Sequence, residues 1–188
     1  MKIGIISDTH GCSLTWKKIF DRYLADADLI IHAGDVLYHG PRNAIPAEYD
    51  PKGLAESLNA CPVPIIIAAG NCDAEVDSMV LHIPIQSPYA YVFADGLRIL
   101  VNHGHKLNDQ EKLDSATGYK VNLFISGHTH IAALNTQNDI TLLNPGSPCM
   151  SKSKDGHGTI AVLADLQLTI FDIETGESLV SQKLKTNV

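Results

Sequence analysis

Two histidines separated by one residue stand in the segment Gly127-His128-Thr129-His130, which follows the apolar run Leu123–Ile125 with Ser126 between. A glycine at the start of the segment favours a turn, so both imidazoles can reach one pocket from a short piece of backbone. Imidazole is a ligand for Zn²⁺, Mn²⁺, Fe²⁺ or Ni²⁺. A single His-x-His pair is weak evidence, and its weight here comes from similar segments elsewhere in the chain.

Other polar segments also follow apolar runs: Ser7-Asp8-Thr9-His10, His32-Ala33-Gly34-Asp35, Gly70-Asn71-Cys72-Asp73 and Asn102-His103-Gly104-His105. In open α/β sheets, ligands bind beyond the carboxyl ends of the strands. The candidate metal ligands at these ends are Asp8, His10, Asp35, Asn71, His103, His128 and His130. Seven oxygen and nitrogen ligands are too many for one ion with an open position. They suit two ions about 3.5–4 Å apart that share a carboxylate, as in two-metal hydrolases.

The first half of the chain predicts the elements that bring these residues together. Residues 3–6, 29–31 and 63–68 are short apolar runs typical of strands covered on both faces, and helical spacing is found over 14–25 and 52–60. Ser13 is the predicted cap of the first helix. Right-handed β-α-β connections put the strand ends at one edge of a sheet. Residues 38–51 show no period and contain three prolines, which indicates a loop.

The second half has a different character. Asp95-Gly96 between residues 89–93 and 97–101 predicts a hairpin, and residues 108–119 predict a polar helix. Further strands are expected over 123–125, 132–136, 140–143, 159–163, 168–173 and 178–184. The expected fold is α/β, a single domain over 1–188. It is a two-sheet β-sandwich with a parallel centre, antiparallel strands that build the second sheet, and helices on the outer faces.

Composition limits the partners and the compartment. The formal charge is −7, which argues against a stable nucleic-acid complex, because backbone binding needs clustered Lys and Arg. The apolar start of the chain is too short for a signal peptide, and no run of about 18 apolar residues predicts a membrane span. Cys12, Cys61, Cys72 and Cys149 show no paired spacing, so we expect reduced thiols in a cytoplasmic protein.

The motifs Asp8-x-His10, Gly34-Asp35, Gly70-Asn71, His103-Gly104-His105 and Gly127-His128-x-His130, in this order, resemble the calcineurin-like metallophosphoesterase family. The resemblance runs from residue 3 to about residue 147, and Gly34–Asn43 and Gly70–Asp73 are most similar to its bacterial phosphodiesterases. It implies a two-sheet sandwich and two bound divalent ions, for which Mn²⁺ is the first candidate and Zn²⁺, Fe²⁺ and Ni²⁺ are the alternatives. It also implies hydrolysis of a phosphoester by a metal-bound hydroxide.

The resemblance also implies a division of the ligands. Asp8, His10, Asp35 and His130 would hold one ion, and Asp35, Asn71, His103 and His128 would hold the other, with Asp35 shared. Many members of the family carry His directly after the Asn, where it is available to the leaving group, whereas this chain has Cys72. We therefore expect either a preference for good leaving groups or a proton donor from elsewhere, for which His105 is the candidate. Arg42 is the candidate for binding the phosphate.

Simpler roles are expected for other polar residues. His32 is expected to be either a core residue or, in preference, a residue that orients a ligand. Asp73 is expected to cap a short helix that contains Val76, Met79 and Val80. His82 and His157 are expected to be ordinary surface or packing histidines.

The leading function is a metal-dependent phosphodiesterase acting on a small-molecule phosphoester. The alternatives are a phosphomonoesterase or nuclease of the same fold, and a non-catalytic interaction scaffold like the retromer subunit that shares it. Every ligand position is filled, which favours an enzyme. The β-rich tail would allow a homo-oligomer, and nothing in the sequence demonstrates one.

Overall fold

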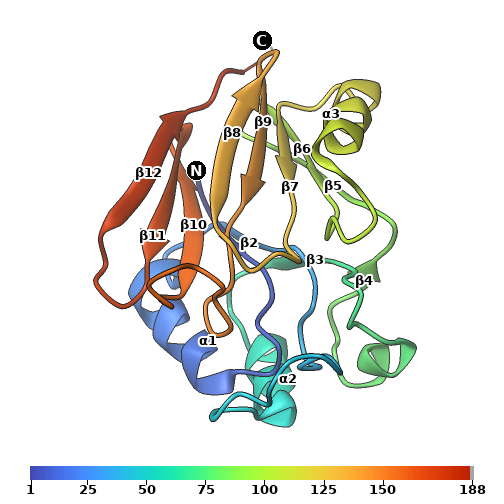
Figure 1. Cartoon of the computed structure of the whole chain (residues 1–188), viewed down its shortest axis with the longest axis vertical. Coiled ribbons are helices and arrows are strands. Elements are labelled where there is room, and N and C mark those ends of the chain that lie inside the picture. The colour runs from blue at the N-terminus through green and yellow to red at the C-terminus, as the bar shows by residue number, and fades with distance from the viewer. Residues whose placement is uncertain (187–188) are drawn as a thin grey trace.

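Apolar strands build two mixed β-sheets that pack face to face (Figure 1). The structure, a computed structural model, describes residues 1–186. The first sheet has the order β12-β11-β10-β1-β2-β3-β4. Its parallel half is β1 (Lys2–Ile6), β2 (Leu29–His32), β3 (Ile65–Ala68) and β4 (Ile85–Gln86), and its antiparallel half is β10 (Thr159–Ala164), β11 (Gln167–Asp172) and β12 (Ser178–Lys183).

The second sheet has the order β5-β6-β7-β9-β8. The hairpin β5 (Ala90–Ala94) and β6 (Leu97–Val101) is followed by the parallel strands β7 (Leu123–Ile125) and β9 (Ile140–Asn144), and β8 (Ala133–Gln137) closes the edge. The two-sheet prediction is confirmed, but the C-terminal strands extend the first sheet rather than the second. Alternation of apolar residues fixes which face of a strand is buried and does not identify the strand's partner.

Three groups of buried side chains hold these layers together. The largest lies between the sheets and includes Ile5, Ile31, Val101 and Ile125. A second lies under the helices α1 (Ser13–Ile19) and α2 (Pro51–Asn59), and a third lies under α3 (Asp109–Gly118). Within residues 1–186, none of the helices is both long and apolar enough to cross a bilayer.

The helix ends correct one local prediction. Ser13 is the first residue of α1 rather than its cap. Its hydroxyl donates instead to the carboxylate of Asp50, at the start of α2, at 3.3 Å. Asp50 is itself the cap of α2, because its carboxylate accepts from Gly53 N at 2.9 Å. Asn108 caps α3 in a reciprocal arrangement with Glu111.

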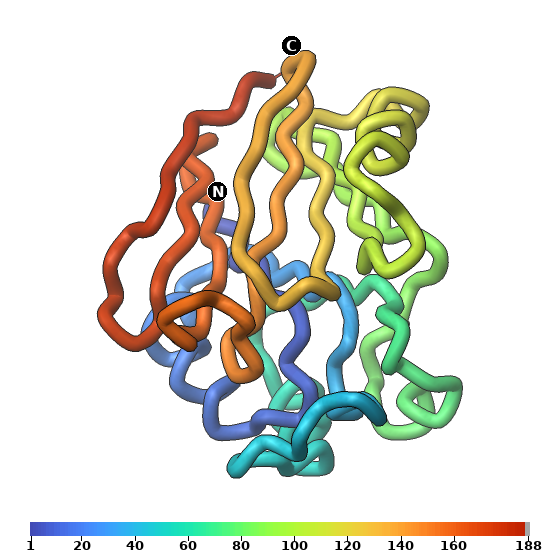
Figure 2. The backbone as a smooth tube through the Cα atoms, viewed as in Figure 1, coloured from blue at the N-terminus to red at the C-terminus, as the bar shows by residue number. Residues whose placement is uncertain are grey.

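A disulfide contradicts the expectation that all the cysteines are reduced. Cys12 and Cys149 are bonded to each other across 137 residues, whereas Cys61 and Cys72 are free. Cys12 follows β1, and Cys149 precedes β10, which is the antiparallel neighbour of β1. Figure 2 shows the red C-terminal segments returning to the N-terminal strand. The pairing therefore depends on the topology of the sheet, which the spacing of cysteines along the chain does not reveal.

Candidate metal centre

The turns that follow the parallel strands carry the predicted ligands in an uncommon backbone conformation. Asp8, His10, Asp35, His128 and His130 have positive φ angles of 55°, 44°, 59°, 70° and 59°. Positive φ is disfavoured for residues with a Cβ atom, and such strained positions cluster at functional sites. The strain indicates that these turns are built to aim their side chains.

Three imidazoles are oriented by backbone carbonyls. The Nδ1 atom of His10 lies 2.7 Å from Tyr38 O, that of His103 lies 2.8 Å from Ala33 O, and that of His130 lies 2.6 Å from Met150 O. A carbonyl oxygen can only accept, so each Nδ1 carries the hydrogen and donates it. The Nε2 atoms are thereby turned toward the interior of the site, which is how metal-binding histidines are commonly held.

The Nε2 atoms converge on two buried carboxylates. His130 Nε2 lies 3.3 Å from Asp8 Oδ1, and His103 Nε2 lies 3.2 Å from Asp35 Oδ2. His10 Nε2 lies 3.7 Å and 3.8 Å from these two carboxylates and only 3.1 Å from His130 Nε2. The buried Nε2 of His103 has no hydrogen-bond partner.

Two sets of donor atoms in this cluster fit divalent cations. One set is Asp8, His10 and His130, and the other is Asp8, Asp35 and His103, and within each set the atoms lie within 4.8 Å of one another. Imidazole nitrogens and carboxylate oxygens are a donor set that Mn²⁺, Fe²⁺ and Zn²⁺ accept. The five residues of these two sets therefore fit divalent cations.

The pKa values of Asp8 and His103 are shifted because these charged groups lie so close together. Burial alone would raise the pKa of Asp8, but hydrogen bonds with His10 and His130 outweigh burial and lower this pKa far below its usual range. Burial opposes the charged form of His103, yet Asp35 and Asp8 raise its pKa to about 9. Protons and metal ions thus compete for the same Nε2 atoms, so metal binding is expected to release protons.

His32 is completely buried and contacts the backbone and a hydroxyl group beside the cluster. Gly34 N donates to His32 Nδ1 at 3.1 Å, so the ring hydrogen is on Nε2, which bonds to Thr9 Oγ1 at 2.9 Å. Thr9 Oγ1 in turn donates to Val36 O at 2.9 Å. Complete burial lowers the pKa of His32 to about 3, so the ring is neutral. It joins the turn after β1 to the turn after β2.

The prediction that Asp73 caps the helix that follows is wrong. Its carboxylate accepts from the backbone N–H groups of Asp35, Val36 and Gly70 at 2.9, 2.7 and 2.7 Å. Ala74 precedes the following 3₁₀ turn (Glu75–Met79) instead, and its N–H donates to Asp77 within that turn at 2.9 Å. Asp73 therefore fixes the turn that presents Asp35, a role that the sequence did not suggest.

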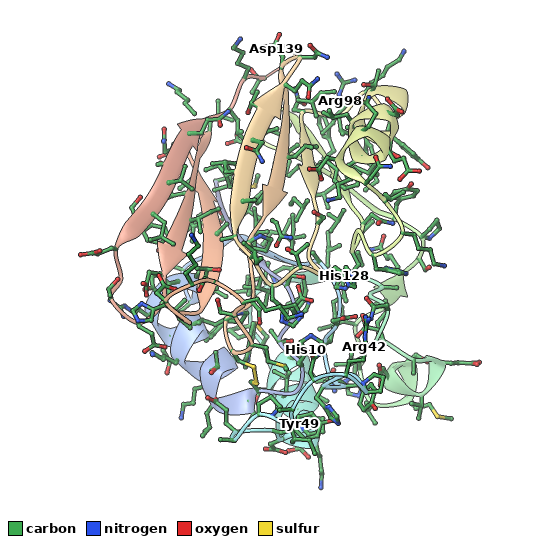
Figure 3. All side chains as sticks on the ribbon, viewed as in Figure 1. His10, Arg42, Tyr49, Arg98, His128 and Asp139 are labelled. Atoms are coloured by element: carbon green, nitrogen blue, oxygen red, sulfur yellow. A yellow bond between two sulfur atoms is a disulfide. The ribbon has the colours of Figure 1, made fainter. Side chains whose placement is uncertain are left out.

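A cleft of about 880 Å³ opens beside the cluster. Its lining includes the predicted residues Asp35, Arg42, Asn71, Cys72, His128 and His130, together with Lys152, which no motif identified. Figure 3 shows Arg42, His10 and His128 in one region, with Arg98 and Asp139 at the opposite end of the molecule.

Cys72 and His105 occupy different positions relative to this cleft. Cys72 Sγ lies within 4.8 Å of the donor atoms of His10 and Asp35, and burial with the nearby Asp35 raises its pKa to about 12. His105 is not among the residues that line the cleft. Its ring centroid lies 5.7 Å from that of His103 and 6.1 Å from that of His128, and burial and His103 lower its pKa.

The sequence is similar to known phosphoesterases. Residues 1–167 match the family model described as the calcineurin-like phosphoesterase superfamily domain. The chain is 37% identical to phosphodiesterase YfcE of Escherichia coli K12 over 153 residues, which cover 81% of this chain and 82% of YfcE. It is 30% identical to a probable metallophosphoesterase of Methanothermobacter thermautotrophicus over 194 residues, which cover 99% and 93% of the two chains.

Solved structures agree with these relatives. The E. coli YfcE phosphoesterase superposes with a TM-score of 0.82 at 29% identity and covers 98% of this chain and 100% of its own. Vacuolar protein sorting 29 of Cryptosporidium parvum superposes with a TM-score of 0.71 at 15% identity, with 98% of each chain covered. At that identity the second match shows a shared fold alone.

Proposed function

Because the chain belongs to the calcineurin-like phosphoesterase superfamily, and is thereby a metal-dependent phosphoric ester hydrolase, we propose that it cleaves small-molecule phosphodiesters at a two-metal centre. One observation carries the proposal. Three buried imidazoles, each held through Nδ1 by a backbone carbonyl, turn their Nε2 atoms toward Asp8 and Asp35. A structural ion-pair cluster would have no need for this arrangement, whereas a metal centre requires it.

We assign the ligands as the motifs suggest. Asp8, His10, Asp35 and His130 would hold one ion, and Asp35, Asn71, His103 and His128 the other, with Mn²⁺ the proposed metal and Zn²⁺, Fe²⁺ or Ni²⁺ the alternatives. When bound, such ions polarise phosphoryl oxygens and lower the pKa of water. Asn71 is a neutral ligand and would leave the charge of its ion intact.

The chain's own side chains would bind and orient the ester. Arg42 and Lys152 bring positive charge to the cleft, and the planar guanidinium of Arg42 suits two phosphate oxygens. Cys72 would contact the substrate as a neutral thiol, since its pKa is raised to about 12. So weak an acid is a poor proton donor, which favours esters with good leaving groups. His105 is kept as the proposed alternative donor, since its ring lies close to those of His103 and His128.

The first experiment is hydrolysis of bis-p-nitrophenyl phosphate by metal-stripped protein, with and without Mn²⁺. We expect Mn²⁺ to restore activity in the wild type and not in Asn71→Ala, and p-nitrophenyl phosphate to be cleaved more slowly. Faster cleavage of the monoester would favour a phosphomonoesterase. Two equivalents of Mn²⁺ bound without hydrolysis would favour the scaffold alternative, and failure to bind Mn²⁺ would overturn the proposal.

The remaining proposals concern the setting of the enzyme. We propose a cytoplasmic protein that forms no stable nucleic-acid complex, and a homo-oligomer is open to test by light scattering. Structural disulfides are uncommon in reducing compartments, so the Cys12–Cys149 bond counts against the cytoplasm and makes fractionation of cells the decisive test.

A further inference from the structure

A second cavity of about 600 Å³ adjoins the catalytic cleft. Its apolar lining comes from Leu37, Tyr38, Tyr49, Ala55, Val76 and Val80. The two cavities have Tyr38, Cys72 and Ala74 in common, so the second opens beside the first rather than on another face. A volume of this size lies within the range of small-ligand sites.

The wall between the cavities is fixed to the metal cluster. The carbonyl of Tyr38 accepts from His10 Nδ1 at 2.7 Å, and Cys72 N donates to Asp35 Oδ1 at 2.7 Å. Two of the three shared residues, Tyr38 and Cys72, are therefore one hydrogen bond from a proposed ligand. A group that rests against this wall keeps a defined distance from the reacting phosphate.

The charges of the two cavities differ. The catalytic cleft has Arg42 and Lys152 on its lining, which suits an anionic phosphate. In the second cavity the charge of Lys52 is opposed by Glu56, 3.9 Å away on the same exposed helix face, and Asp77 is also present. This balance offers no attraction to a second phosphate.

Two polar side chains of the second cavity, Asn59 and Asp77, are already hydrogen-bonded within the protein. The side chain of Asn59 donates to Val80 O at 2.7 Å and accepts from His82 N at 2.8 Å. Asp77 accepts from Ala74 N at 2.9 Å. A nucleobase or sugar would find these groups committed and leave its own polar atoms unpaired, at a cost in affinity. An apolar ring would lose no hydrogen bonds there.

We propose that the second cavity is the subsite for an uncharged aromatic ester group of the substrate, held between the phosphate cleft and the 3₁₀ turn Glu75–Met79. The inference rests on the proposed phosphodiesterase function and adds the class of diester: one arm is an aryl group of one or two rings. Tyr38 and Tyr49 supply aromatic surface, which favours ring contacts beyond simple burial of area.

The test is calorimetric binding of methylphosphonate and phenylphosphonate to the full-length, Mn²⁺-loaded protein, so that no turnover is needed. Both would place their phosphonate at the metal centre, and only the phenyl group can fill the second cavity. We expect phenylphosphonate to bind about 10- to 100-fold more tightly, the effect of burying one ring. The variant Val80→Glu puts a charge into the cavity and should reduce this ratio below about 3-fold.

A matched control separates the subsite from a general effect of charge. Val80 is 48% exposed and Val180 on β12 is 40% exposed, so neither substitution should disturb the core. Val180→Glu should keep the full ratio. Equal affinity for the two phosphonates in the wild type, or an unchanged ratio in Val80→Glu, would overturn the subsite and leave the phosphodiesterase proposal standing. Failure of both phosphonates to bind would count against the phosphodiesterase proposal itself.

Discussion

Within residues 1–186, two clusters of histidine and carboxylate have the composition of a metal site, yet they are built differently. The buried cluster holds Asp8, Asp35 and three histidines, and the surface cluster consists of Asp155, His157 and Asp172. In the surface cluster His157 Nδ1 bonds directly to Asp172 Oδ2 at 2.7 Å, and the ring is 40% exposed. In the buried cluster the Nδ1 atoms bond to backbone carbonyls, and the Nε2 atoms face the carboxylates.

The difference lies in which groups are already satisfied. Asp172 Oδ1 accepts from the backbone N–H groups of Glu174 and Thr175, and Asp155 Oδ1 accepts from Ser153 Oγ and His157 N. The surface cluster is therefore an ion pair in a turn. The buried cluster leaves His103 Nε2 without a partner. Metal-binding ability thus follows from the unused donor atoms rather than from the residue types.

The largest expected effect is loss of activity in His103→Gln. This change removes a proposed ligand, and interactions with a catalytic metal contribute several kcal/mol, so hydrolysis of bis-p-nitrophenyl phosphate should fall about 1,000-fold or more. His157→Gln is the matched control and should retain wild-type activity. Equal losses in the two variants would remove the distinction between the clusters.

The second effect concerns the disulfide near the buried cluster. Cys149 directly precedes Met150, whose carbonyl orients His130. Replacing Cys149 by Ser should lower the free energy of unfolding by about 2–4 kcal/mol. It should also weaken Mn²⁺ binding, whereas Cys61→Ser, at a free thiol elsewhere, should leave Mn²⁺ affinity unchanged. Urea unfolding and calorimetry measure the two effects, and unaltered Mn²⁺ affinity in Cys149→Ser would show that the loop holds its place without the bond.

The third effect is stabilisation by metal. With free Mn²⁺ at about 100 times its dissociation constant, the folded state should gain about 2.7 kcal/mol, because the unfolded chain lacks the site. Thermal unfolding with and without Mn²⁺ should show this gain in the wild type and in His157→Gln. The gain should shrink or vanish in His103→Gln. If the gain in stability were lost in His157→Gln and kept in His103→Gln, Mn²⁺ would bind at the surface cluster and not at the buried one.

The smallest effect is the pH dependence of the surface pair. Asp172 raises the pKa of His157 above its ordinary 6.5. Burial would raise the pKa of Asp172, but hydrogen bonds from backbone N–H groups and from His157 outweigh burial and hold this pKa below its ordinary 3.8. A raised histidine pKa stabilises the fold below 6.5, and this stabilisation is lost as the pH rises through the raised value. His157→Gln should therefore unfold at a slightly lower temperature than the wild type at pH 5.5, and the two should converge by pH 9. A difference that grows at high pH would contradict the pairing.

Patterns within short stretches of sequence were enough to predict most of the strands and the site residues at their ends. Short apolar runs followed by Asp, His or Asn identified the strands β1, β2, β3 and β7 and the residues at their ends, because a strand buried on both faces is visible in its own sequence. β4 was missed because Ile85–Gln86 is only two residues long and has no periodicity to detect. The order of strands also escaped prediction, since it depends on long-range pairing.

The supporting groups of the site could not be predicted for a related reason. The carbonyls of Tyr38, Ala33 and Met150 orient the histidines, and every residue carries a carbonyl, so no residue type marks them. Lys152 reaches the cleft from a loop distant in sequence from the ligands near the N-terminus. Asp73 was visible in its motif, but its three backbone partners were not.

The position of β1 has a consequence for synthesis of the chain. β1 is made before the other strands that the structure describes, and it pairs with β2 on one side and with β10, more than 150 residues later, on the other. Until Thr159–Ala164 leaves the ribosome, one edge of β1 has no partner from its own sheet, and unpaired edges invite contact with other chains. The turn that carries Asp8 and His10 therefore gains its last supporting strand only near the end of translation. A nascent chain that stalls before residue 159 would expose this edge.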